Sequence, residues 1–172
     1  MLKDSVRVMA KEAERDNEAV PYTEEDVDRV MSFWEGKNYH DRVQIGDFAV
    51  TFYDAGHVLG SAMILAETEG LPADKAGKKI LFSGDLGNPA NPLLNGFEKV
   101  GGAEILVLES TYGDREHEGI EEKKLKLERV IEQSVVNGGV LMIPAFSLEK
   151  TQELLWEISD NLRKKKVTNV PI

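Results

Sequence analysis

The sequence contains no cysteine, no long apolar run and no secretory signal, and each absence excludes a class of protein. Without cysteine among its 172 residues, the chain has neither disulfide bonds nor thiolate metal ligands. No apolar stretch approaches the roughly 20 residues that a membrane-spanning helix needs. Residues 1–19 lack the apolar core and the small-residue cleavage site of a secretory signal. We therefore expect a cytoplasmic protein that is not inserted into a membrane.

An excess of positive charge is also lacking. The chain has 31 acidic and 21 basic residues, which gives a formal net charge of -10. Such a surface repels a polyanion as a whole, so any contact with nucleic acid must be local. The one basic cluster, Arg163 to Lys166, follows a helical pattern. Because cations are favoured at a helix C-terminus, we interpret this cluster as a solvated helix end.

The pattern of apolar residues predicts two helices, then several strands, then alternating strands and helices. Helices are expected over residues 4–17, 23–36, 120–137 and 147–166, and strands over 43–55 (a hairpin turning at Gly46 and Asp47), 61–68, 78–85, 103–111 and 138–146. The last three strands are apolar on both faces, which favours central positions in a covered sheet. Residues 68–79 are rich in Gly, Pro and charge, which is typical of a loop. The order of these elements is typical of a layered α/β protein.

Three polar residues stand at the ends of predicted strands: His57, Asp85 and Glu109. Functional groups in α/β proteins gather at strand ends, because the sheet holds them rigidly while the loops leave room for a ligand. Each has a structural alternative. His57 would be a buried histidine held by hydrogen bonds, and Asp85 and Glu109 would cap backbone N–H groups of nearby loops.

An imidazole and a carboxylate suit zinc, manganese or iron, and a shared carboxylate can bridge two ions about 3.5 to 4 Å apart. Such a pair of ions polarises a phosphoryl oxygen and lowers the pKa of a bound water toward neutrality. No H-x-H or H-E-x-x-H motif occurs anywhere in the sequence. Spacing alone is therefore weak evidence for a metal site.

Four ordered segments add a more specific signal: "DAGHVLGSAMI", "ILFSGDLG", "AEILVLESTYGDR" and "GGVLMIPAFSLEKTQELLWEI". Together they resemble the middle of metallo-β-lactamase-fold hydrolases of the β-CASP group, the RNA-processing nucleases. The resemblance covers nearly the whole chain. It implies part of an α/β/β/α sandwich, with residues 1–172 as a single partial metallo-β-lactamase-like domain cut near the start of a β-CASP insertion.

The resemblance also implies roles for individual residues. His57 matches the metal-binding histidine of the G-H-x-x-G-S-A segment, and Asp85 matches the aspartate of G-D-x-G that bridges two zinc ions. Glu109 matches the acidic residue of the first β-CASP motif, which would orient a later histidine that protonates the leaving oxygen. Metal ligation is thus expected of His57 and Asp85, and catalysis of Asp85 and Glu109. We also expect the backbone to approach the ions closely at three glycines, which have no side chain in the way: Gly56, Gly60 and Gly84.

Two family features are missing from this sequence. The H-x-H-x-D-H signature, which supplies most of the metal ligands, would lie ahead of the point where the chain begins, and the two late β-CASP histidines are absent. None of the three histidines, His40, His57 and His117, stands in such a setting, and we expect His117 to be solvent-exposed. Two ligands remain of a site that needs six or seven, so zinc would be weakly bound or absent here.

The leading hypothesis is a segment of a zinc-dependent ribonuclease that hydrolyses RNA phosphodiesters and is inactive as this isolated chain. The second is a non-catalytic scaffold or binding subunit that pairs with an active partner. The third is a hydrolase of small esters or phosphodiesters, against which "ESTYGDR" and "PAFSLEKTQELL" argue. The expected partners are RNA and either a second copy of this chain or a partner chain that supplies the missing segments, with no membrane partner.

Overall fold

The structure, a computed structural model, forms two compact units, Met1–Asn38 and Tyr39–Ile172. It describes residues 2–68, 77–88, 91–116, 118–164 and 166–167. His117 and most of the expected loop over 68–79 therefore lie outside the described residues. Among the described residues, no helix has the length and apolar character needed to cross a membrane.

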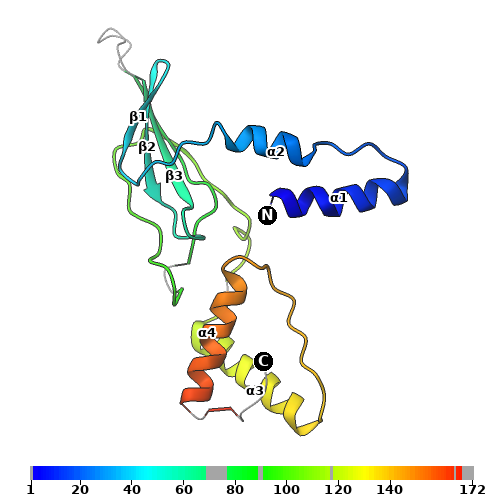
Figure 1. Ribbon diagram of the computed structural model, residues 1–172. Helices are drawn as coiled ribbons and strands as arrows, with labels where there is room; N and C mark the ends of the chain where they lie inside the picture. Colours follow the sequence, from blue (N-terminus) through cyan, green and yellow to red (C-terminus); the bar gives the residue numbers. More distant parts are fainter. Residues whose placement is uncertain (1, 69–76, 89–90, 117, 165, 168–172) are drawn as a thin grey trace. The chain divides into compact units, whose positions relative to one another are not determined.

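Residues 2–38 of the first unit form two helices, α1 (Leu2–Asp16) and α2 (Glu24–Met31) (Figure 1). Thr23 begins α2 with a capping box, in which the Asp26 amide donates to Thr23 Oγ1 and the Thr23 amide donates to the Asp26 carboxylate. The helix is shorter than the expected 23–36. It ends at Met31, and the Ser32 hydroxyl that follows donates to the Arg29 carbonyl at 2.7 Å.

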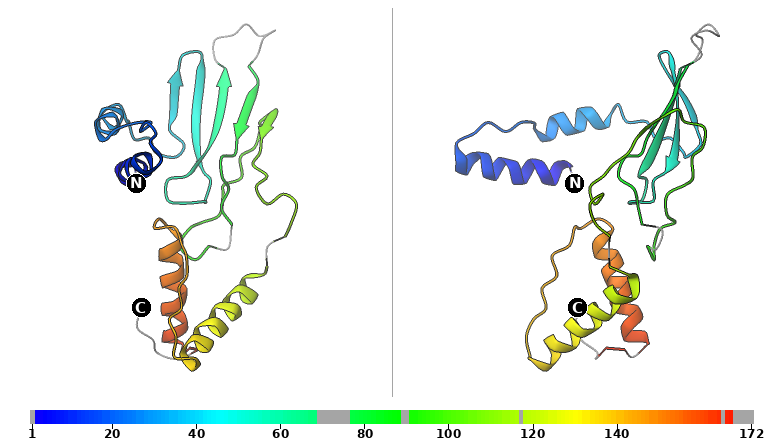
Figure 2. Two further views of the ribbon diagram at one scale, coloured as in Figure 1. Left: turned by 90° about the vertical axis from the view of Figure 1, so that its right-hand side faces the viewer. Right: turned by 180° about the vertical axis from the view of Figure 1, so that it is seen from behind.

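In its described residues, the second unit contains one five-stranded sheet and two helices. The strands follow chain order, with antiparallel pairs except for the parallel pair β4 and β5 (Figure 2). Their bounds, with those of the helices, are β1 (Arg42–Ile45), β2 (Phe48–Asp54), β3 (Ala62–Thr68), β4 (Lys79–Phe82), β5 (Ile105–Val107), α3 (Ile120–Val136) and α4 (Lys150–Arg163). The predicted α/β class is confirmed.

The expected hairpin forms where the sequence predicted it. Ile45 pairs with Phe48 across the two-residue turn, and Gly46 has a φ of 59°, which glycine adopts without steric cost. The strand that follows, β3, buries Met63 and Leu65 on one face. This alternation is the period-2 pattern of a strand with one covered face.

The core beneath the sheet reaches into the loops at its edge. Met63, Leu65 and Leu81 form a buried cluster with Ala55, which follows β2, and Leu86, which follows β4, packs against it. Ala55 lies two residues before His57, and Leu86 directly follows Asp85. The same apolar cluster therefore anchors the sheet and the loops that carry His57 and Asp85.

Strand direction brings three strand ends to one edge. β2 and β4 are each antiparallel to β3 and therefore run the same way, and β5 is parallel to β4. The carboxyl ends of β2, β4 and β5 consequently lie at the same edge of the sheet. These are the ends after which His57, Asp85 and Glu109 occur.

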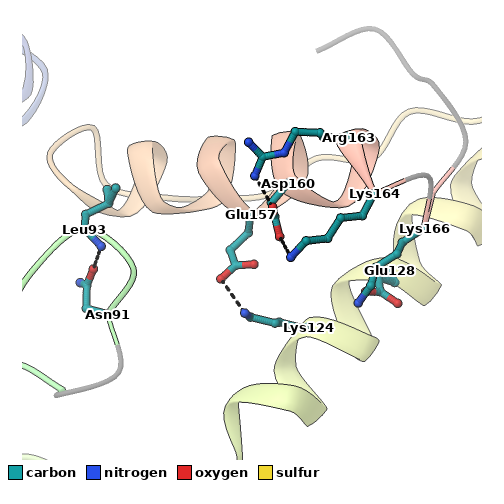
Figure 3. Close-up of polar contacts among 9 residues, drawn as sticks. All are labelled: Asn91, Leu93, Lys124, Glu128, Glu157, Asp160, Arg163, Lys164 and Lys166. Atoms are coloured by element: carbon teal, nitrogen blue, oxygen red, sulfur yellow. Dashed lines mark hydrogen bonds and ion pairs between the residues drawn. The ribbon is translucent and has the colours of Figure 1, made fainter.

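The two helices of the second unit contact each other through apolar and charged side chains. Ile131 of α3 and Ile158 of α4 are buried in one cluster. Lys124 Nζ of α3 also lies 3.6 Å from a carboxylate oxygen of Glu157 of α4, and both side chains are partly buried (Figure 3). Both helices lie close to the residues that the sequence predicted, with α3 within 120–137 and α4 within 147–166.

The basic cluster lies at the end of α4, and the carboxylates around it reduce its net charge. Asp160 accepts from Arg163 and from Lys164, each at 2.6 Å, and Lys166 lies 3.1 Å from Glu128 (Figure 3). The side chains of Arg163, Lys164 and Lys166 are exposed. These contacts fit the interpretation of the cluster as a solvated helix end.

The strand expected over residues 138–146 is absent from the structure, and that prediction was wrong. Val140 is 89% exposed and Met142 85% exposed, in an irregular segment. A strand needs a neighbouring strand to pair with, and this segment meets none among the described residues after α3 ends, where Gly138 has a φ of 61° and Gly139 N–H bonds the carbonyl of Ser134. This Schellman motif turns the chain out of the helix without pairing it to a strand.

β5 also differs from the central, covered strand that the sequence predicted. Ile105, Leu106 and Val107 are all exposed, and β5 pairs only with β4 among the described residues. Since the segment over 138–146 does not pair with it, β5 is an edge strand here.

Candidate active site

His57 lies in the turn that joins β2 to β3. The turn is closed by the Ala55 amide, which donates to the Ser61 carbonyl at 3.1 Å. Ser61 Oγ accepts from the amides of His57, at 3.0 Å, and Val58, at 3.2 Å. These bonds fix the backbone while the His57 side chain is exposed. The structural alternative of a buried histidine was wrong.

Gly56, next to His57, lies against a neighbouring backbone segment. Its φ is 62°, and a Cβ built there would lie 2.6 Å from the carbonyl oxygen of Asn95 and 2.7 Å from the amide nitrogen of Phe97. No side chain fits in this space. The glycine is therefore required for backbone-on-backbone packing, whereas the close approach to metal ions expected of it stays a prediction.

The loop after β4 packs on the His57 turn at Gly87. The Gly87 amide donates to the Ala55 carbonyl at 2.8 Å. A Cβ on Gly87 would lie 1.6 Å from the Gly56 carbonyl oxygen and 2.6 Å from the His57 amide nitrogen. Sequence reasoning missed Gly87, although the second glycine of G-D-x-G, two residues after Asp85, was a signal for it.

The carboxylates of Asp85 and Glu109 differ in their hydrogen bonds to the backbone. The Asp85 side chain is exposed, and among the described residues its carboxylate caps no backbone N–H group. Glu109 Oε1 accepts from the Leu86 amide at 2.9 Å, and Oε2 accepts from the Thr111 amide at 3.4 Å. The structure thus confirms the loop-capping alternative for Glu109, and one of the capped amides directly follows Asp85.

The Glu109 carboxylate is held in its charged form. The Leu86 amide, followed by the bonds from Thr111 and the nearby His57 imidazole, keeps the pKa of this carboxyl below its usual value. Glu109 is itself fixed through its amide, which donates to Ser83 Oγ at 2.9 Å. The Ser83 hydroxyl, just after β4, therefore holds the backbone at Glu109, as the Ser61 hydroxyl holds the backbone of the His57 turn.

The structure brings together the segments that carry all three predicted residues. The His57 turn contacts the Asp85 loop through Gly87, and Glu109 bonds the Asp85 loop through Leu86. The donor types, imidazole and carboxylate, suit zinc. Within the described part of the chain, however, no group of three or more His, Asp or Glu side chains could hold a metal ion. These residues are the right type for a metal centre but too few to complete one.

No model of a known protein family matches the sequence. The chain is 35% identical over 155 residues to an RNase J-like protein of Methanocaldococcus jannaschii, which covers 88% of this chain and 35% of the relative. It is 36% identical over 135 residues to Endoribonuclease YSH1 of Eremothecium gossypii, covering 78% of this chain and 17% of the relative. It is also 35% identical over 159 residues to Cleavage and polyadenylation specificity factor subunit 3 of Dictyostelium discoideum, covering 90% of this chain and 19% of the relative.

The chain belongs to the metallo-β-lactamase/β-CASP family. The relatives confirm the resemblance found in the four sequence segments, because the similarity runs over most of the chain. The chain spans about a third or less of the length of these β-CASP relatives. Their names describe whole proteins, so activity and substrate remain to be argued from the site.

Gly87→Ala tests the packing of the two loops. Because its Cβ would overlap the Gly56 carbonyl, we expect a loss of about 1–3 kcal/mol in the free energy of unfolding, the range for overpacked sites. Gly101→Ala is the matched control, since a Cβ there meets nothing within 4 Å. Urea denaturation of both variants measures the difference. Equal stabilities would contradict the contact between Gly87 and the His57 turn.

Ionisation of Glu109 makes the stability of the folded chain depend on pH. Since its pKa is lowered on folding, its contribution to stability is present above the ordinary glutamate value of about 4.3 and is lost as pH falls through the lowered value. An NMR titration of the Glu109 carboxyl carbon measures this pKa. Glu109→Gln should also flatten the fall of stability in that acidic range. A titration midpoint at or above the ordinary value would contradict the bonds to Leu86 and Thr111.

Proposed function

We propose that this chain forms one side of the active site of a ribonuclease that hydrolyses RNA phosphodiesters. The observation that carries the proposal is the meeting of three strand-end segments, which bear His57, Asp85 and Glu109, at one edge of the sheet. Each of these residues stands in a segment that matches the family. Relatives named as ribonucleases support the reaction class.

In this proposal His57 and Asp85 are ligands of zinc. When bound, a pair of zinc ions polarises the phosphoryl oxygen and supplies a nucleophilic water near neutral pH. Catalytic zinc normally has three protein ligands, and this chain offers two candidates. The remaining ligands come from residues that this sequence does not contain, supplied by a longer polypeptide or by a partner chain.

Asp85 and Glu109 have separate tasks. The exposed Asp85 carboxylate has both oxygens available toward a cation, as a bridging ligand requires. Glu109 already accepts two backbone N–H groups, but an ionised carboxylate has about four acceptor positions. It can therefore hold the Asp85 loop and also orient a histidine that donates a proton to the leaving oxygen.

A non-catalytic scaffold is the second candidate function. The incomplete ligand set among the described residues favours it. A scaffold would keep the packed loops and the RNA-processing partners of the family but would not cleave RNA in any context. Activity measured with a completed ligand set separates the two functions.

The isolated chain should bind zinc weakly and should not cleave RNA. Isothermal titration with Zn²⁺ and incubation with labelled single-stranded RNA measure the two properties. His57→Ala should remove the zinc binding, whereas His40→Ala is the control, because His40 pairs with Glu98 at 2.8 Å. Cleavage that depends on metal and on His57 would show that the further ligands are dispensable.

Substitutions separate the two carboxylates in any polypeptide that joins these residues to an H-x-H-x-D-H segment. Asp85→Asn should abolish RNA cleavage and lower metal content, since an amide cannot offer two anionic oxygens to two cations. Glu109→Gln should keep metal content while turnover falls about 10² to 10⁴-fold, the range for general acid help.

Metal analysis and single-turnover kinetics on both variants test these roles. Asp114→Asn is the control, because Asp114 is exposed and pairs with its neighbour Arg115 at 2.9 Å. Loss of metal in Glu109→Gln would make Glu109 a ligand. An unchanged rate would make it a loop cap and nothing more.

A further inference from the structure

Glu149 has a backbone conformation that its residue type disfavours. It precedes α4 with φ 68° and ψ -56°, and the Lys150 amide donates to the Leu148 carbonyl at 2.8 Å across it. This is a γ-turn of the rare, positive-φ form, which is strained for any residue with a side chain. Such strain persists only where the surrounding structure over-determines it. A glycine would tolerate a positive φ more readily, so what the glutamate adds is its side chain.

The Glu149 side chain is buried, at 6% exposed, and does not cap its own helix. Its Oε2 accepts instead from the Leu59 amide at 3.2 Å. Leu59 belongs to the turn that carries His57 and lies far from Glu149 in the sequence. A buried carboxylate that accepts a backbone N–H makes a charge-assisted bond, which is stronger than one between neutral groups.

A second contact joins the first turn of α4 to the other site loop. The Glu153 amide donates to the Glu149 carbonyl at 2.8 Å, so Glu149 directly supports Glu153. The Glu153 carboxylate accepts from the side-chain amide of Asn91, which follows the Asp85 loop. Asn91 in turn accepts from the Leu93 amide at 2.7 Å (Figure 3). Carboxylates of the start of α4 thus bond the segments beside both candidate ligands.

We propose that Glu149 is a positioning residue that holds the His57 turn from the start of α4. Ser61 orders this turn from within, and Glu149 fixes it to a separate element of the chain. The role of this turn in an active site rests on the proposed function. The hydrogen bond from Leu59 to Glu149 does not, and it can be measured without metal or RNA.

Three variants of the ¹⁵N-labelled chain test the proposal. Glu149→Gly removes the carboxylate and relieves the strained φ, while Glu149→Gln keeps an acceptor of the same length. Asn17→Gly is the control for strain relief, because Asn17 has a φ of 55° in the first unit. The readouts are amide exchange at Leu59, backbone order over residues 57–61, and stability in urea.

In Glu149→Gly we expect the Leu59 amide to exchange about tenfold faster or more, and order over 57–61 to fall, without a loss of global stability. Glu149→Gln should restore most of the protection, and Asn17→Gly should leave Leu59 unchanged. Unchanged exchange in Glu149→Gly, or exchange in Glu149→Gln as fast as in Glu149→Gly, would overturn the proposal.

The same samples separate this proposal from the proposed function. A wild-type chain that protects Leu59 through Glu149 but shows no zinc bound at His57 would support the positioning role and count against the metal ligand. A wild-type chain that binds zinc at His57 but leaves the Leu59 amide unprotected from exchange would support the metal ligand and overturn the positioning role of Glu149.

Discussion

The candidate site depends on one contact between backbones, the hydrogen bond from the Gly87 amide to the Ala55 carbonyl. It is 2.8 Å long and lies where Gly87 and Gly56 pack without side chains between them. Ala55 and Leu86 also join the apolar cluster under the sheet. The two loops are therefore fixed by the same core that stabilises the strands, and the site and the fold share one set of interactions.

Three carboxylates then hold the loops from other elements. Glu109, which follows β5, bonds the Leu86 amide, and Glu149 and Glu153 at the start of α4 bond the segments beside His57 and Asp85. In each case the carboxylate is bound to a loop while the candidate ligand keeps its own side chain exposed. A preorganised metal or phosphate site needs such a fixed backbone together with contacts that lock the rotamers of the ligand side chains.

Sequence patterns predicted what depends on local periodicity and on matched motifs. The hairpin at Gly46 and the strand ends that carry His57 and Asp85 follow from alternation of apolar residues and from turn chemistry. The strand over 138–146 failed because an apolar run does not encode its partner, and Gly138 turns the chain away at the end of α3. The roles of Gly87 and Glu149 depend on contacts between distant segments, which no local pattern contains.

The central claim is that the His57 turn packs on the Asp85 loop in solution. A ¹⁵N-edited NOESY spectrum of the chain tests it directly. The account predicts cross-peaks between the Gly87 amide proton and the α protons of Ala55 and Gly56, as close backbone contact requires. Absence of these peaks, in a spectrum that shows the cross-strand contacts of β2 and β3, would contradict the site.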